Sequence, residues 1–136
     1  MIAGAVIVRY MHIRCMELPM LTALVADFCE ADRLSPKRMS NRLRIPMGEL
    51  AKLTGVHRNT LAQSPGSPAV QKRLEPVARI LAAAEELAGD ADRAIVWFRH
   101  QPLPGHGGRT ALDLIEEGHS AAVFAYLEDL RDGVYA

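Results

Sequence analysis

The side chains able to do chemistry in this sequence form no catalytic pattern. None of the five histidines stands in the His-x-x-x-His or His-Glu-x-x-His spacing that places two metal ligands on one helix face. The adjacent acids Glu85 and Glu86, like Glu116 and Glu117, point in different directions on a helix, so we expect solvated surface rather than an acid and a base. The sequence therefore predicts no enzyme, no metal site and no cofactor.

The glycine-rich and cysteine-containing segments do not change this prediction. No buried strand precedes the glycines of residues 105–108, and no Lys-Ser/Thr follows them, as a phosphate-binding loop requires. Cys15 and Cys29 have neither metal-binding spacing nor a disulfide framework, so we expect reduced thiols in a cytoplasmic protein. The apolar start of the sequence is short and is followed by Arg9 and Arg14, which argues against a signal peptide or a membrane span.

Polar side chains between residues 57 and 63 have the chemistry that reads base edges in DNA. Arginine can form two hydrogen bonds with guanine, and Asn or Gln can do the same with adenine. Nearby basic side chains suit phosphate, which contributes affinity and salt dependence but little specificity. The predicted base contacts are His57, Arg58, Asn59, Thr60 and Gln63, and the predicted phosphate contacts are Arg44 and Lys52, with Arg42, Lys72 and Arg73.

The spacing around these side chains predicts a helix-turn-helix over residues 46–63. Ala51 permits close approach of a second helix, and Gly55, four residues later, permits a left-handed turn. Leu50, Val56 and Leu61 fall where the two helices must pack against the rest of the domain. Because a helix-turn-helix normally needs a second copy to bind tightly, we expect a homodimer on a palindromic site.

The charge is divided unevenly along a chain whose net charge is zero. Residues 1–32 carry a net charge of −2, residues 33–79 of +8 and residues 80–136 of −6. This asymmetry indicates two kinds of partner, with the basic segment suited to an anion such as DNA. The alternative is that these Lys and Arg side chains only solvate helix surfaces, and charge alone does not decide between the two.

Hydrophobic periodicity and capping signals predict an all-α fold with no strand after residue 18. We divide the chain into an N-terminal extension and helix (1–34), a helix-turn-helix subdomain with a long connecting helix (35–89) and a helical C-terminal subdomain (90–136). The dimer contact is expected from either the N-terminal helix or the helix that carries Trp97. The predicted helices span residues 19–32, 36–43, 46–54, 57 to about 63, roughly 69–88, 112–117 and 120–132. One more helix contains Ile95, Trp97 and Phe98 and is capped by Asp90 or Asp92.

The C-terminal sequence contains a series of motifs in a specific order. The series is a helix with Trp97, a loop with Pro102 and Pro104, Gly-Gly-Arg-Thr at 107–110, Leu-Asp-Leu-Ile at 112–115, an acidic-Gly step at 117–118, an amphipathic helix and a Gly-Val-Tyr-Ala terminus. In this order and spacing, the segment resembles the toxin-binding domain of the Xre/MbcA/ParS antitoxin family. Residues 35–93 are similar to the Xre-like DNA-binding half of that family.

The resemblance implies an antitoxin that represses its own operon, binds a RES-domain toxin that depletes NAD, and forms a higher hetero-oligomer with it. It also implies that the C-terminal tail blocks the NAD-binding cleft of the toxin. The toxin-binding residues implied in this way are Gly108, Arg109, Arg131, Asp132, Gly133, Val134, Tyr135 and Ala136. From the residues alone, Val134 and Tyr135 could instead fold back onto the last helix. The alternative function is a freestanding helix-turn-helix regulator without a toxin.

Overall fold

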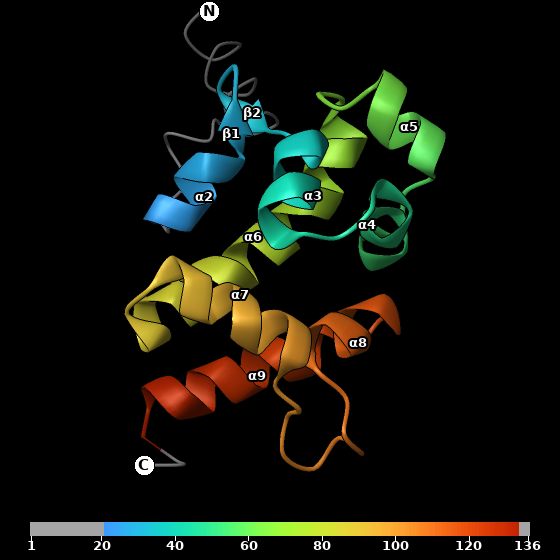
Figure 1. The fold of residues 1–136 in the computed structure, drawn as a ribbon. Coiled ribbons are helices and arrows are strands. Elements are labelled where there is room, and N and C mark those ends of the chain that lie inside the picture. Colours follow the sequence, from blue (N-terminus) through green and yellow to red (C-terminus); the bar gives the residue numbers. More distant parts are fainter. Residues whose placement is uncertain (1–20, 134–136) are drawn as a thin grey trace, which may run out of the picture.

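The computed structural model describes residues 21–133 as a helical protein with one very small sheet (Figure 1). This confirms the predicted all-α fold. In chain order the elements are α2 (Ala23–Phe28), β1 (Cys29–Glu30), β2 (Arg33–Leu34), α3 (Pro36–Leu43), α4 (Met47–Thr54), α5 (Arg58–Gln63), α6 (Pro68–Ala88), α7 (Ala91–His100), α8 (Ala111–Glu116) and α9 (Ser120–Arg131).

Side-chain caps explain where the helices begin. Ser35, Ser67 and Asp90 each accept a hydrogen bond from a backbone N–H in the first turn, of α3, α6 and α7 respectively. The α6 helix is 21 residues long and continues through Pro76. No helix among residues 21–133 is long and apolar enough to cross a membrane.

The segment from residue 29 to residue 34 corrects the sequence prediction, which continued a helix to residue 32 and placed no strand here. The α2 helix ends at Phe28, and Cys29 and Glu30 pair antiparallel with Leu34 and Arg33. Ala31 and Asp32 form the turn with φ angles of 51° and 64°. Strands of two residues show no alternation of polarity, and the turn lacks the Gly that usually indicates such a hairpin.

One buried hydrophobic cluster extends from α2 to α9, with the long α6 helix in contact with both ends of it. Leu74 in the first half of α6 and Leu81 in the second half are both fully buried. Figure 1 shows α6 running between the N-terminal helices and the layer of α7, α8 and α9. The proposed subdomains at 35–89 and 90–136 therefore share a core, and their boundary stays a prediction.

Two polar side chains of α6 hold the N-terminal elements in place. The carboxylate of Glu85 accepts a hydrogen bond from the backbone N–H of Leu24 at 2.9 Å. The amide of Gln71 accepts from the N–H of Leu34 at 3.0 Å and donates to the carbonyls of Leu34 and Pro65 at 2.7 and 2.9 Å. The pair Glu85 and Glu86 is thus not simply solvated surface, because one of its carboxylates satisfies a helix terminus.

The expectation of reduced thiols is wrong for Cys29, which is disulfide-bonded in the structure. The other cysteine of the sequence, Cys15, lies outside the described residues. The spacing of cysteines in a sequence can reveal metal-binding motifs and frameworks of several disulfides. A single disulfide depends instead on the distance between two Cα atoms in the fold.

Candidate functional site

The helix-turn-helix is formed by α4, the turn at residues 55–57 and α5. Gly55 ends α4 with a φ angle of 71°, the left-handed conformation that a residue without a Cβ adopts easily. Leu50 and Leu61 are buried, and Val56 packs against the same core. These positions confirm the predicted packing of the two helices. As a result, α5 is held by one apolar side chain and presents its other faces outward.

The predicted base-reading residues all lie together on the exposed part of α5. Leu61 is the only buried residue of this helix, whereas Arg58, Asn59, Thr60 and Gln63 are exposed. His57 is also exposed and has a structural contact that the sequence did not predict: its Nδ1 accepts a hydrogen bond from the backbone N–H of Asn59 at 3.1 Å. The exposed face therefore offers a guanidinium, amides and a hydroxyl from a single rigid element.

Two arginines from other elements flank the helix-turn-helix. The guanidinium of Arg73, on α6, lies 3.9 Å from where a Cβ on Gly55 would be. Arg33, on β2, packs so closely on Gly66 in the loop after α5 that a Cβ on this glycine would overlap its guanidinium. Arg73 is one of the phosphate contacts predicted from the sequence, whereas Arg33 is not. Its position beside the loop follows from the 29–34 hairpin, which carries little sequence signal.

The other predicted phosphate contacts lie toward the C-terminal half. Arg44 is exposed at the end of α3 and lines a surface hollow with Arg99 and His100 of α7. Lys52, exposed on α4, is close enough to Glu116 on α8 to lower the pKa of that carboxyl. Arg44 thus lies beside α7 and Lys52 near α8, and their DNA contacts stay predictions.

The loop between α7 and α8 is closed by hydrogen bonds around Arg109 and Thr110. Arg109 Nε lies 2.9 and 2.8 Å from the two carboxylate oxygens of Glu117, and a guanidinium nitrogen donates to the His106 carbonyl at 3.3 Å. Thr110 and Asp113 exchange the two hydrogen bonds of a capping box that starts α8. Arg109 thus shapes the loop in which Gly108 is exposed with a φ of 83°.

The residues at the end of α9 are exposed. Arg131, the last residue of the helix, lies 3.7 Å from the carboxylate of Glu86 on α6. Asp132 and Gly133 follow it, and Gly133 has a φ of 79°. Val134, Tyr135 and Ala136, the predicted blocking tail, lie outside the described residues.

Glu116 on α8 is not the solvated carboxylate that the sequence predicted. One of its carboxylate oxygens is buried and has no hydrogen-bond partner among the described residues. Burial raises the pKa of Glu116, and the carboxylates of Glu49 on α4 and Asp113 on α8 raise it further. Because α4 belongs to the helix-turn-helix, this carboxyl lies at the contact between the two halves of the protein.

The raised pKa of Glu116 predicts that the contribution of this group to stability falls as the pH rises. A group whose pKa is higher in the folded than in the unfolded protein stabilises the fold fully below its unfolded pKa, and this stabilisation is lost as the pH rises through the folded pKa. Glu116→Gln keeps the neutral form, so we expect it to stabilise the protein by about 1 kcal/mol at pH 7, or roughly 4 °C in Tm. Thermal unfolding at pH 7 and pH 4 measures this, with a smaller difference from wild type expected at pH 4.

The exposed Glu128 of α9 offers a matched control. Glu128→Gln removes the same charge and should change Tm little at either pH. A Glu116→Gln protein no more stable than wild type at pH 7 would contradict the role of this carboxyl at the contact of α4 and α8.

Among the residues that the structure describes, no group of three or more His, Cys, Asp or Glu side chains could hold a metal ion. The structure brings the sequence-predicted site residues into two exposed regions. One is the polar face of α5, and the other is formed by α7, α8, α9 and the loop between α7 and α8.

The comparison with protein families bears on the second region. Residues 83–133 match the family described as the antitoxin Xre/MbcA/ParS C-terminal toxin-binding domain. The matched segment comprises the end of α6, then α7, the loop, α8 and α9. No curated protein matches the chain, and no solved structure matches it. The match shows that residues 83–133 are similar to the toxin-binding domain of an antitoxin family.

Proposed function

We propose that this protein is a cytoplasmic antitoxin that inhibits a RES-domain toxin through residues 83–136 and represses its own operon through α5. The observation that carries the proposal is the match of residues 83–133 to a toxin-binding domain. The RES-domain identity of the toxin rests on the sequence resemblance described above. On this proposal the protein has no catalytic residues of its own and acts only by binding.

Inhibition is proposed to come from the C-terminal tail. The α9 helix ends at Arg131, and Asp132 and Gly133 after it are exposed. Tyr135 would bring a large, rigid side chain with a hydroxyl. An aromatic ring is suited to a cleft that binds the rings of NAD. Gly108 and Arg109, in the exposed loop, would contact the toxin outside that cleft.

Repression is proposed to come from α5 in the major groove. The helix exposes Arg58, Asn59, Thr60 and Gln63, whose groups can pair with base edges. It lies in a segment of net charge +8, which suits the DNA backbone. A palindromic operator would be bound by a homodimer, and the complex with toxin would be a larger hetero-oligomer.

Purification of the tagged full-length protein from its native host tests the toxin half of the proposal. We expect a RES-domain protein to co-purify in stoichiometric amount and to be identified by mass spectrometry. A sample of the protein alone, under conditions in which the neighbouring gene is expressed, would contradict the proposal.

That second outcome would favour a freestanding transcriptional regulator. The helix-turn-helix at residues 47–63 lies outside the matched segment and is complete without it, which is the observation in favour of this alternative. Such a protein would bind its operator with unchanged affinity whether or not any toxin gene is present.

A further inference from the structure

The exposed face of α7 carries an apolar side chain that no described element covers. Val96, in the middle of the helix, is 59% exposed, the largest value among the large hydrophobic residues that the structure describes. Trp97 beside it is only partly buried against the core. Isolated exposed hydrophobic residues are common, so the meaning of Val96 depends on the side chains around it.

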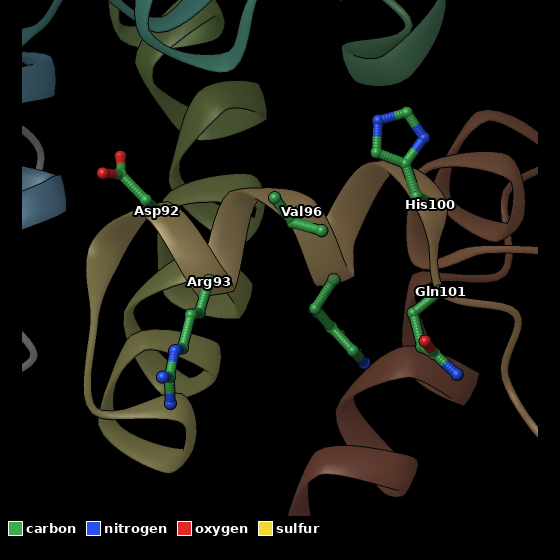
Figure 2. A pocket seen from close by; sticks show the side chains of 6 residues that line it. Asp92, Arg93, Val96, His100 and Gln101 are labelled. Carbon is green, nitrogen blue, oxygen red and sulfur yellow. The ribbon is translucent and has the colours of Figure 1, made fainter.

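Charged side chains surround Val96 in an ordered way. On one side, a hollow of about 360 Å³ is lined by Asp92 and Arg99, together with Arg44. On the other side, a hollow of about 410 Å³ is lined by Arg93, Trp97 and Gln101, and Asp92, Val96 and His100 line both hollows. Figure 2 shows Arg93 leaving α7 on the side opposite Asp92. Val96 therefore lies on a ridge between two hollows. Asp92 before it and Arg99 after it lie to the same side of Val96, about 40° and 60° around the helix axis.

This arrangement is complementary to itself. If a second α7 lies antiparallel across Val96, a two-fold axis brings each Val96 against the other. Asp92 lies four residues before Val96 and Arg99 three after it, so their axial offsets are about 6 and 4.5 Å in opposite directions. In the second copy the two-fold axis reverses the direction of these axial offsets. A side chain that lies to one side of Val96 in the first copy lies to the same side of the contact in the second. Asp92 of one copy therefore meets Arg99 of the other, and the pair forms twice.

We propose that α7 is the homodimer contact, with Val96 at its centre and Asp92 paired with Arg99 of a second copy. Asp92 already lies 3.2 Å from Arg42 of its own chain, yet its side chain is 80% exposed and keeps acceptor capacity for another arginine. A helix of ten residues buries little area, so the dimer is weak, with a Kd of roughly micromolar. The proposal rests on the homodimer of the proposed function, but its test needs neither toxin nor DNA, so it can fail while the toxin partnership holds.

Sedimentation equilibrium of the full-length protein between about 1 and 200 µM tests the proposal, since that range brackets a micromolar Kd. Wild type is expected to dimerise, and Val96→Asp to weaken dimerisation at least about tenfold, because two buried carboxylates would then face each other. Leu87→Asp is the matched control, since Leu87 is 41% exposed at the end of α6 and outside the proposed contact. It is expected to leave the Kd unchanged.

Exchanging the charges at residues 92 and 99 distinguishes the loss of this contact from a general loss of structure. Asp92→Arg and Arg99→Asp are each expected to weaken the dimer, and the protein carrying both changes to recover most of the wild-type affinity. Circular dichroism confirms that each variant is folded before its mass is measured. The proposal is overturned by a wild-type protein that stays monomeric, by a Kd unaffected by Val96→Asp, or by a folded double variant that shows no recovery.

Discussion

A protein that lacks residues 133–136 is expected to keep its fold and its DNA binding but to lose the ability to neutralise its toxin. The buried core ends at Leu127, so the deletion removes no core residue that the structure describes. If the tail occupies the NAD-binding cleft, its loss reopens that cleft even while other contacts still hold the two proteins together. Inhibition of NAD consumption in a purified mixture should weaken by roughly 100-fold or more, the scale of an interface hot spot.

Single substitutions make this test sharper. Tyr135→Ala should lose most of the inhibition, whereas Tyr135→Phe, which keeps the ring, should retain much of it. Lys37→Ala, on the exposed surface of α3, serves as a control that should inhibit like wild type. Full inhibition by the truncated protein would show that the toxin is blocked by another part of residues 83–132.

Replacing both Arg58 and Asn59 with alanine is expected to abolish specific binding to the DNA upstream of the protein's own gene. Each bidentate pair between a side chain and a base contributes about 1–3 kcal/mol of discrimination, so the loss of two corresponds to roughly 100-fold or more in affinity. Both side chains are exposed on α5 and neither belongs to the core, so the fold should be unaffected. Fluorescence anisotropy with operator and scrambled duplexes measures the change.

Arg73 provides the comparison for this prediction. It lies beside the turn at Gly55, where a phosphate contact is expected, and Arg73→Ala should weaken binding to operator and scrambled DNA alike. The double variant at residues 58 and 59 should affect the operator only. An operator preference that survives this double variant would remove α5 from the role of recognition helix.

The sequence predicted most helices because their signals are local. Caps such as Ser35 and Asp90, and turn residues such as Gly55, act within a few positions of where they stand. The exposed face of α5 followed from the same pattern, since the apolar positions of a helix-turn-helix determine which side chains remain outside. The hairpin at residues 29–34 was missed because its pairing is too short to leave a periodic signal.

The properties that the sequence did not reveal depend on contacts between distant segments. Glu116 resembles any surface carboxylate in sequence, and only the packing of α8 on α4 buries one of its oxygens near Glu49. Arg33 lies beside Gly66 because the hairpin is fixed to α6 by Gln71, a contact between residues 37 positions apart. Net charge and hydrophobic periodicity cannot predict such neighbours, since neither carries information on which surfaces of the protein pack together.

The α6 helix has a consequence for how such proteins can diversify. Its first half completes the core under the helix-turn-helix, and its second half completes the core under α7 and α9. If the proposed function holds, recombination that joined the DNA-reading half of one such protein to the toxin-binding half of another would cut through this helix and place mismatched side chains around Leu74 and Leu81. We therefore expect operator choice and toxin choice to be inherited together, and new pairings to arise by point substitution on the two exposed surfaces.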